Sequence, residues 1–120
     1  MRIEALSKEY EMPYNEKIEA RINKMVAGWK NTDKKKMFGG VCHLIKGNMF
    51  CGVYKDYLIL RLGEEQAGEA MQHASVRPFD ITGRPMKGWV MVAGEGFENN
   101  ADLHDWLNQA KRFAKTLPPK

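Results

Sequence analysis

The sequence lacks any apolar run long enough to cross a bilayer. A membrane-spanning helix needs about 18 or more consecutive apolar residues, and every apolar stretch here is soon interrupted by charged or polar residues. The first residues, MRIEALSKEYE, alternate charged with apolar side chains and do not form the apolar core of a signal peptide. These two absences argue against a membrane protein and predict a cytoplasmic location with no membrane partner.

Cysteine is scarce, because the chain contains only Cys42 and Cys51. Two cysteines are too few for a disulfide scaffold, and an unexported chain would keep them reduced, so free thiols are expected. His43 follows Cys42, but adjacent strand residues point to opposite faces, so His43 is expected to project away from both thiols. We therefore predict neither a zinc site nor a Cys–His nucleophilic pair.

Phosphate-binding loops of the GxGxxG or GK[ST] type are absent. The paired glycines Gly39 and Gly40 are better explained by a bulge or a close backbone approach at the start of a strand. His73 and His104 fall on expected helices with no neighbouring Ser or Cys nucleophile to activate. The sequence therefore predicts no catalytic residues, no cofactor and no metal, which is the pattern of a non-enzymatic protein.

What the chain does contain is an ordinary globular composition. Its 120 residues are 43% hydrophobic and 28% charged, which predicts one domain with one core. The formal net charge is +4, and the positive charge is concentrated in one stretch. Six basic residues and a single acid lie between positions 34 and 62, and this stretch is also the one with strand-like patterning.

Helix signals flank that stretch. Asn15 is a suitable N-cap for a helix whose apolar stripe is Ile18, Ile22, Met25, Val26 and Trp29. A shorter helix is expected from residue 64 to residue 74. The last helix has Asn100 as its expected N-cap and ends before Pro118 and Pro119. Its apolar stripe is formed by Leu103, Trp106, Leu107, Ala110, Phe113, Ala114 and Leu117.

The segments KMFGGVCHLI, NMFCGVY and YLILRL predict a three-stranded antiparallel meander, with two-residue turns at 47–48 and 55–56. MKGWVMV is expected to extend the sheet later in the chain. The order is therefore α-β-β-β-α-β-α, which favours a two-layer α+β fold with the helices packed on one face of the antiparallel sheet.

Alternation along the expected strands separates two faces of the sheet. The face predicted to pack beneath the helices is wholly apolar and contains Cys42, Leu44, Met49, Cys51, Val53, Leu58, Leu60 and Leu62. The opposite face is mixed, and together with the loop that follows it supplies the predicted binding surface. That surface consists of His43, Phe50, Tyr54, Tyr57, Arg61 and Arg84.

The stretch RPFDITGRPMKGW, residues 77–89, contains two Pro, two Gly and three basic residues. Asp80 can bond its own backbone, Gly83 suits the closing position of a type I turn, and Pro85 fixes φ before a strand. We expect Phe79 and Trp89 to anchor this turn to the core. A less favoured alternative is a small-ligand or enzymatic site that uses Asp80 and Arg84 beside Trp89.

The run KKMFGGVCHLIKGNMFCGVYKDYLILRLG, followed by RPFDITGRPMKGWVMV and AKTLPPK, resembles the TfoX (Sxy) N-terminal domain family. The resemblance covers residues 13–120 and implies a secretion-chaperone-like α+β domain in a standalone, single-domain member. Residues 1–12 are then expected to be a variable extension, or translation starts at Met12. The best-known members of the family promote expression of competence genes in bacteria, so the resemblance implies a regulatory role and supplies no catalytic residues.

Two kinds of function are consistent with these features. The first is a non-enzymatic binding or regulatory module that contacts a protein partner, with a homodimer through the open sheet face or edge as one form of such contact. The alternative is weak nucleic-acid binding, in which aromatic side chains of the mixed face stack on bases and the surrounding lysines meet phosphates.

Overall fold

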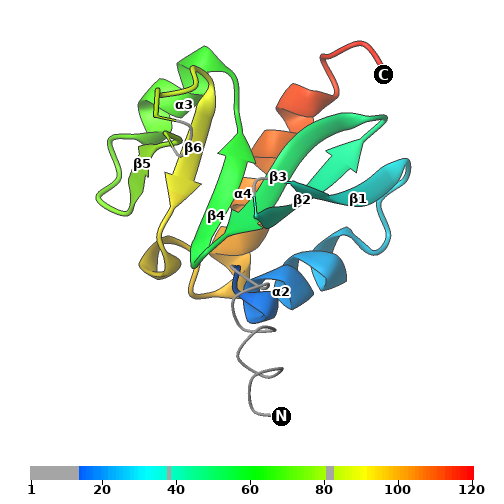
Figure 1. Cartoon of the computed structure of the whole chain (residues 1–120), viewed down its shortest axis with the longest axis horizontal. Coiled ribbons are helices and arrows are strands. Elements are labelled where there is room, and N and C mark those ends of the chain that lie inside the picture. The colour runs from blue at the N-terminus through cyan, green and yellow to red at the C-terminus, as the bar shows by residue number, and fades with distance from the viewer. Residues whose placement is uncertain (1–13, 38, 81–82) are drawn as a thin grey trace.

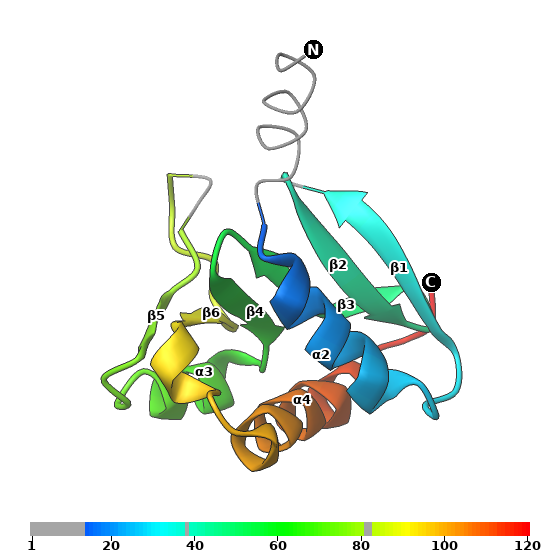
Figure 2. The same cartoon turned by 90° about the horizontal axis from the view of Figure 1, so that it is seen from below.

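A computed structural model describes residues 14–37, 39–80 and 83–120. Six antiparallel strands form one sheet, and the helices lie on one of its faces, as the views in Figures 1 and 2 show. The predicted α+β class is confirmed. The elements are α2 (Glu16–Val26), β1 (Thr32–Met37), β2 (Gly40–Ile45), β3 (Asn48–Tyr54), β4 (Tyr57–Arg61), α3 (Glu64–Ala70), β5 (Val76–Pro78), β6 (Trp89–Val92), a 3-10 turn (Gly94–Gly96) and α4 (Asn100–Ala114).

The strands lie in the order β1-β2-β3-β4-β6-β5. The predicted meander is β2-β3-β4, and the predicted later strand is β6, which pairs with β4. Two edge strands were not predicted. Four consecutive residues of β1, 33–36, are exposed and charged, so no apolar alternation marks this strand. The other edge strand, β5, has three residues and ends on Pro78, a residue that sheets tolerate at edges.

One of the two predicted turns is displaced by a residue. Tyr54 faces Tyr57 as predicted, but Ile45 pairs with Asn48, so the first turn consists of Lys46 and Gly47. The φ angles of these two residues are +50° and +83°. A type I′ hairpin turn requires positive φ at both central positions, which explains the observed placement.

A β-bulge in the β2–β3 pair reverses part of the predicted face assignment. Leu44 pairs with Met49 and His43 pairs with Cys51, which leaves Phe50 without a partner on β2. Side chains on β3 therefore do not alternate across the bulge, and both Phe50 and Cys51 belong to the core on the helix side. The predicted faces are correct on β4 and on the last part of β3. They are wrong on β2, because the prediction took the register from a turn that is displaced by one residue and did not include the bulge.

The main core lies between the sheet and the helices. α4 crosses β3 and β4, α2 packs on β3, and α3 packs on β6. Trp106 is 8% exposed, and its Nε1 donates a hydrogen bond to the carbonyl oxygen of Gly96 at 3.0 Å. The largest side chains of this core that are fully buried are Ile22, Phe50, Val53, Leu58, Leu60, Leu62, Val90, Phe97, Leu103 and Leu107.

Asparagine side chains cap the N-termini of α2 and α4. The Asn15 side chain accepts hydrogen bonds from the backbone N–H groups of Lys17 and Ile18, so this prediction is confirmed. The cap of α4 is Asn99, one residue before the predicted Asn100. α3 stops at residue 70 instead of 74. Within the described ranges, no helix has both the length and the apolar character needed to span a membrane.

Candidate functional site

The face of the sheet that carries no helix, called the outer face from here on, presents aromatic and basic side chains from four neighbouring strands. Tyr54 and Tyr57 face each other across the β3–β4 turn. Arg61 on β4 is paired with Trp89 on β6, and Arg77 lies on the edge strand β5. These five residues, called the aromatic–cation surface, are half-buried except for Arg77, which is exposed.

Each aromatic ring of this surface has a cation beside it. The Arg61 guanidinium lies 5.3 Å from the centroid of Trp89, and the Lys55 ammonium lies 5.4 Å from that of Tyr54. Arg77 lies 5.8 Å from the Tyr57 centroid and donates a hydrogen bond from Nη1 to the Tyr57 hydroxyl at 3.0 Å. Such contacts fix where a cation sits without neutralising it.

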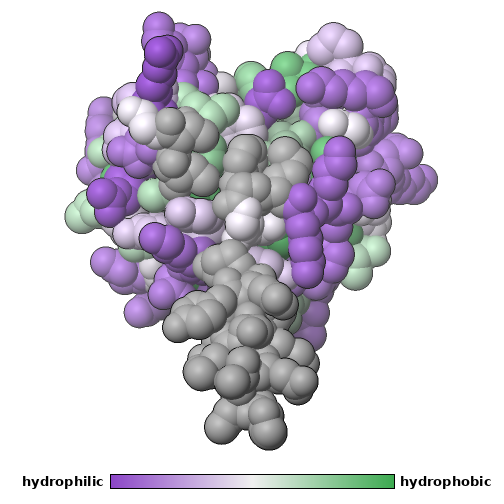
Figure 3. All heavy atoms as spheres, viewed as in Figure 1, coloured by the Kyte–Doolittle hydropathy of each residue, from purple (hydrophilic) through white to green (hydrophobic). Residues whose placement is uncertain are grey.

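No carboxylate lies within ion-pair distance of Lys55, Arg61 or Arg77 in the part of the chain that the structure describes. Figure 3 views this side of the molecule and shows hydrophobic residues in small areas among hydrophilic ones. Near one end of the face, a hollow of about 340 Å³ is lined by Arg61, Lys87 and Trp89 together with Glu64 and Phe113, and Glu64 forms no ion pair with Arg61 among the described residues. The surface therefore combines aromatic area with positive charge that is available to a partner.

Phe79 and Met86, which lie on either side of residues 81 and 82, pack on the outer face beside this surface. Phe79 is 1% exposed and stacks on Trp89, with ring centroids 5.6 Å apart. Gly83 donates its N–H to the carbonyl oxygen of Asp80, as the predicted turn requires, although residues 81 and 82 lie outside the described residues. Phe79 thus belongs to a second, smaller apolar cluster, which lies on the outer face. Its buried members are Cys42, Met49, Ile59, Phe79 and Met91.

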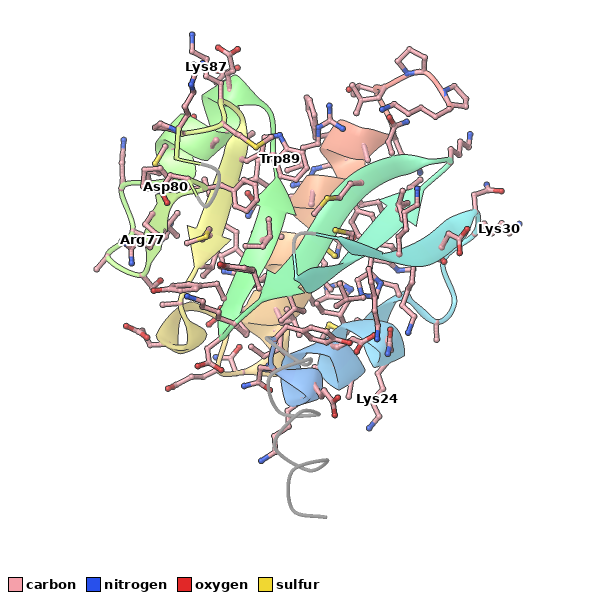
Figure 4. All side chains as sticks on the ribbon, in the orientation of Figure 1. Lys24, Lys30, Arg77, Asp80, Lys87 and Trp89 are labelled. Atoms are coloured by element: carbon pink, nitrogen blue, oxygen red, sulfur yellow. The ribbon has the colours of Figure 1, made fainter. Side chains whose placement is uncertain are left out.

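Figure 4 labels two polar residues of the segment 79–88, Asp80 and Lys87, together with Trp89. Asp80 and Arg84 are both exposed, whereas Phe79 stacks on the Trp89 ring. The role predicted for this stretch, a turn anchored to the core by Phe79 and Trp89, agrees with the buried Phe79. The alternative of a ligand or enzymatic site at Asp80 and Arg84 stays a prediction.

Two residues of the predicted binding surface lie on the opposite side of the sheet. His43 is 1% exposed and Phe50 is fully buried, and their rings meet edge to face with centroids 6.4 Å apart. The physical reason is the bulge, which places both side chains beneath the helices. Tyr54, Tyr57 and Arg61 do lie on the outer face, and Arg84 is exposed.

The basic stretch is also divided between the faces. Residues paired across antiparallel strands share a face, so Lys35, opposite Cys42, lies on the outer side, and Lys34, opposite His43, lies on the helix side. The Lys34 ammonium accordingly forms an ion pair with Glu19 of α2 at 3.1 Å. The outer face is therefore less basic than the sequence suggested.

The thiols and the buried histidine are poorly placed for nucleophilic chemistry. Burial raises the pKa of Cys42 to about 11, and it raises the pKa of Cys51 well above its usual value. Burial, reinforced by Lys34, lowers the pKa of His43 to about 4. His43 does share the helix side with Cys51, contrary to prediction, but a raised thiol pKa leaves little thiolate at neutral pH.

Sequence reasoning missed Arg77 as a member of the aromatic–cation surface, and it treated Trp89 as an anchor or as a neighbour of Asp80 and Arg84, without linking it to Arg61. Arg77 belongs to the short edge strand β5, which no apolar pattern reveals. Trp89 meets Arg61 because β6 pairs with β4. Both residues are placed by the pairing of β6 with β4 and β5. Local sequence carries no signal for that pairing.

Several residues of the quoted family motifs hold backbone segments close together. A Cβ on Gly40 would collide with the carbonyl oxygen of Val53. The Asn48 amide is buried and donates to the carbonyl oxygen of Pro118 at 2.8 Å. The carbonyl oxygen of Gly88 accepts the N–H groups of residues 62 and 63 at 2.8 and 3.1 Å. These motif positions have structural reasons for their residue types.

The model of the TfoX N-terminal domain family matches residues 24–114. No curated protein and no solved structure matches the chain significantly. The matched range contains all six strands of the sheet together with α3 and α4, and it includes the three motif positions Gly40, Asn48 and Gly88. Because the match covers most of the 120 residues, the chain belongs to the TfoX N-terminal domain family.

Proposed function

We propose that the chain is a non-enzymatic regulatory module that binds an acidic protein partner through the aromatic–cation surface. The observation that carries the proposal is the set of three rings, Tyr54, Tyr57 and Trp89, each beside a cation without a carboxylate partner among the described residues. Tyr, Trp and Arg are the residue types that contribute most to protein interfaces. Unneutralised cations beside them favour a partner with acidic side chains.

Family membership supports a regulatory type of domain. We extend the proposal to the process that the family resemblance implies, the regulation of competence genes in a bacterial cytoplasm. A non-enzymatic role agrees with the buried Cys42 and Cys51, whose raised pKa values disfavour the thiolate. It also agrees with His43, which is buried on the helix side.

Nucleic-acid binding by the outer face remains the second candidate, since aromatic rings on a sheet can stack on bases. Two features make it less favourable. Each ring already has a cation beside it, and the lysine run contributes only Lys35 to the outer side, whereas Lys34 pairs with Glu19.

A homodimer through the edge strand β1 would bring two copies of this lysine run together, and like charges at an edge oppose such pairing.

The test is a quantitative pull-down from native extract with three forms of the chain. The double variant Tyr54→Ala/Arg61→Ala removes the centre of the surface, and the control His104→Ala/Arg112→Ala changes two exposed residues on α4. A partner that binds the wild type and the control is then purified for affinity measurement. Truncating two interface residues of this kind is expected to weaken binding by about 2 kcal/mol or more, which is about thirty-fold.

A partner that binds all three forms equally, or no specific partner at all, would contradict the proposal. Labelled single-stranded DNA and RNA are titrated in parallel at low salt. Tight binding that weakens steeply as salt is added would favour the nucleic-acid alternative, because counterion release makes phosphate contacts salt-dependent.

A further inference from the structure

A second concave region lies on the helix side, away from the aromatic–cation surface. It is a cleft of about 510 Å³ formed where the connection from α2 to β1, the turn from β2 to β3, the last turn of α4 and the C-terminal tail meet. Figures 1 and 2 show these four segments converging at the side of the molecule where the C-terminus lies. A volume of this size is within the range of sites for small organic ligands.

Backbone and amide hydrogen bonds hold the walls of the cleft. The N–H of Lys46 donates to the carbonyl oxygen of Asn31 at 2.9 Å, and the N–H of Lys120 donates to that of Lys46 at 2.8 Å. The buried Asn48 amide ties Pro118 to the same hairpin. The tail is thereby fixed along the β2–β3 turn, so the cleft is formed before any ligand arrives.

The charged residues that line the cleft are all basic. Lys30, Lys46, Lys111 and Lys115 all line the cleft, and neither Asp nor Glu does. None of these four ammonium groups has an ion-pair partner among residues 14–37, 39–80 and 83–120. The remaining surface is largely apolar. Its apolar residues are Trp29, Ile45, Ala114, Leu117 and Pro119.

One of these cations is positioned by an aromatic ring. The Lys111 Nζ lies 4.3 Å from the centroid of Trp29, the shortest such distance among the cation–ring contacts of the described residues. Lys111 and Lys115 lie at the end of α4, where the helix dipole favours cations. Lys30 and Lys46 lie on connections outside the helices, so the helix dipole does not explain the whole set.

From this arrangement we infer that the cleft binds a small organic anion, one that joins an aromatic or other flat apolar body to a carboxylate, sulfonate or phosphate group. The apolar body would lie against Trp29 and Ile45, and the anionic group would meet the lysines. The site is independent of the proposed partner-binding surface, because its lining shares no residue with the aromatic–cation surface.

The test compares 2-naphthoate with its neutral analogue 2-naphthol at neutral pH. Binding is measured by isothermal titration calorimetry and located by NMR shift mapping. The naphthoate is expected to bind the wild type at one site, with shifts centred on Trp29, Lys46 and Ala114, and to bind at least about ten-fold more tightly than the naphthol. Inorganic phosphate, which lacks the apolar body, is expected to bind much more weakly than the naphthoate.

Two pairs of variants separate shape from charge. Gly28 lines the cleft, and a Cβ there would meet nothing within 4 Å, so Gly28→Phe is designed to fill the cleft without a clash at its Cβ. Gly68→Phe is the control, because a Cβ at this position on α3 is equally unobstructed. The charge pair is Lys111→Gln/Lys115→Gln, with Lys24→Gln/Arg112→Gln as its control. Lys24 and Lys30 point in different directions in Figure 4, and Lys24 does not line the cleft.

Both test variants are expected to lose at least about ten-fold in naphthoate affinity, and both controls are expected to bind like the wild type. Circular dichroism and thermal unfolding confirm that each variant is folded before it is titrated. The inference is overturned if the wild type does not bind the naphthoate at millimolar concentration, if the naphthol binds equally well, or if both folded test variants retain full affinity.

Discussion

Acidification is expected to destabilise the fold through His43, a buried base with an unsatisfied nitrogen. His43 is 1% exposed, and its Nε2 has no hydrogen-bond partner among the residues that the structure describes. Burial and the charge of Lys34 lower its pKa to about 4, while the smaller effect of Glu19 opposes them. The folded chain therefore keeps this imidazole neutral at pH values where the unfolded chain protonates it.

The sign and the size follow from linkage. Between the unfolded pKa of 6.5 and the folded value of about 4, the unfolded state binds more protons, so the free energy of unfolding falls as the pH falls. The contribution is fully present above pH 6.5 and is lost on the way down to about pH 4. At about 1.4 kcal/mol for each pH unit, the loss is about 3 kcal/mol.

The assay is urea unfolding at a series of pH values from neutral to about 4, with wild type, His43→Leu and the exposed control His104→Gln. Taking the difference between variant and wild type removes the contribution of the carboxylates that all three share, Glu19 included. His43→Leu also removes the orphaned nitrogen, and we expect it to gain stability relative to the wild type by about 3 kcal/mol between pH 7 and pH 4.

NMR titration of the His43 ring gives the pKa directly. A value near 6.5 in the folded chain would refute the reasoning. So would an unfolding free energy that falls with pH as steeply in His43→Leu as in the wild type. His104→Gln should follow the wild-type curve throughout, which distinguishes a specific effect of the buried ring from a general loss of a basic residue.

Other substitutions test the packing, each by urea unfolding. Phe79→Ala removes the buried ring that stacks on the outer face and should cost about 3–5 kcal/mol; a loss below about 1 kcal/mol would contradict its anchoring role. Gly63→Ala should destabilise by at least about 1 kcal/mol, because φ is +87° and the new Cβ would meet an aromatic ring on α4 at 2.8 Å. Gly68→Ala, in an open helical position, should stabilise by about 0.5–1 kcal/mol, and equal effects at the two glycines would contradict both predictions. Asn48→Ala should cost about 1–3 kcal/mol and release the tail from the β2–β3 turn, seen as faster amide exchange near Pro118; unchanged exchange would show that the amide does not hold the tail.

Elements with strong local signals were predicted well. The stripe of α2, its cap at Asn15 and the alternation of β4 each follow from a pattern within a few residues. The edge strand β1 was missed because both of its faces are exposed, so no apolar alternation forms. The predicted binding surface failed at His43 and Phe50 because the displaced turn and the bulge at Phe50 change the register between β2 and β3.

The sequence by itself determined the class of the fold, the helix positions and the family motifs, because periodicity, capping and turn chemistry act over short stretches of chain. Only the tertiary structure decided which side chains meet. The pairing of β6 with β4 brings Trp89 to Arg61, and the meeting of α4, the tail and the β2–β3 turn places four lysines along the cleft that Trp29 also lines. These contacts join residues far apart in the chain, and their geometry depends on a register that local patterns do not encode.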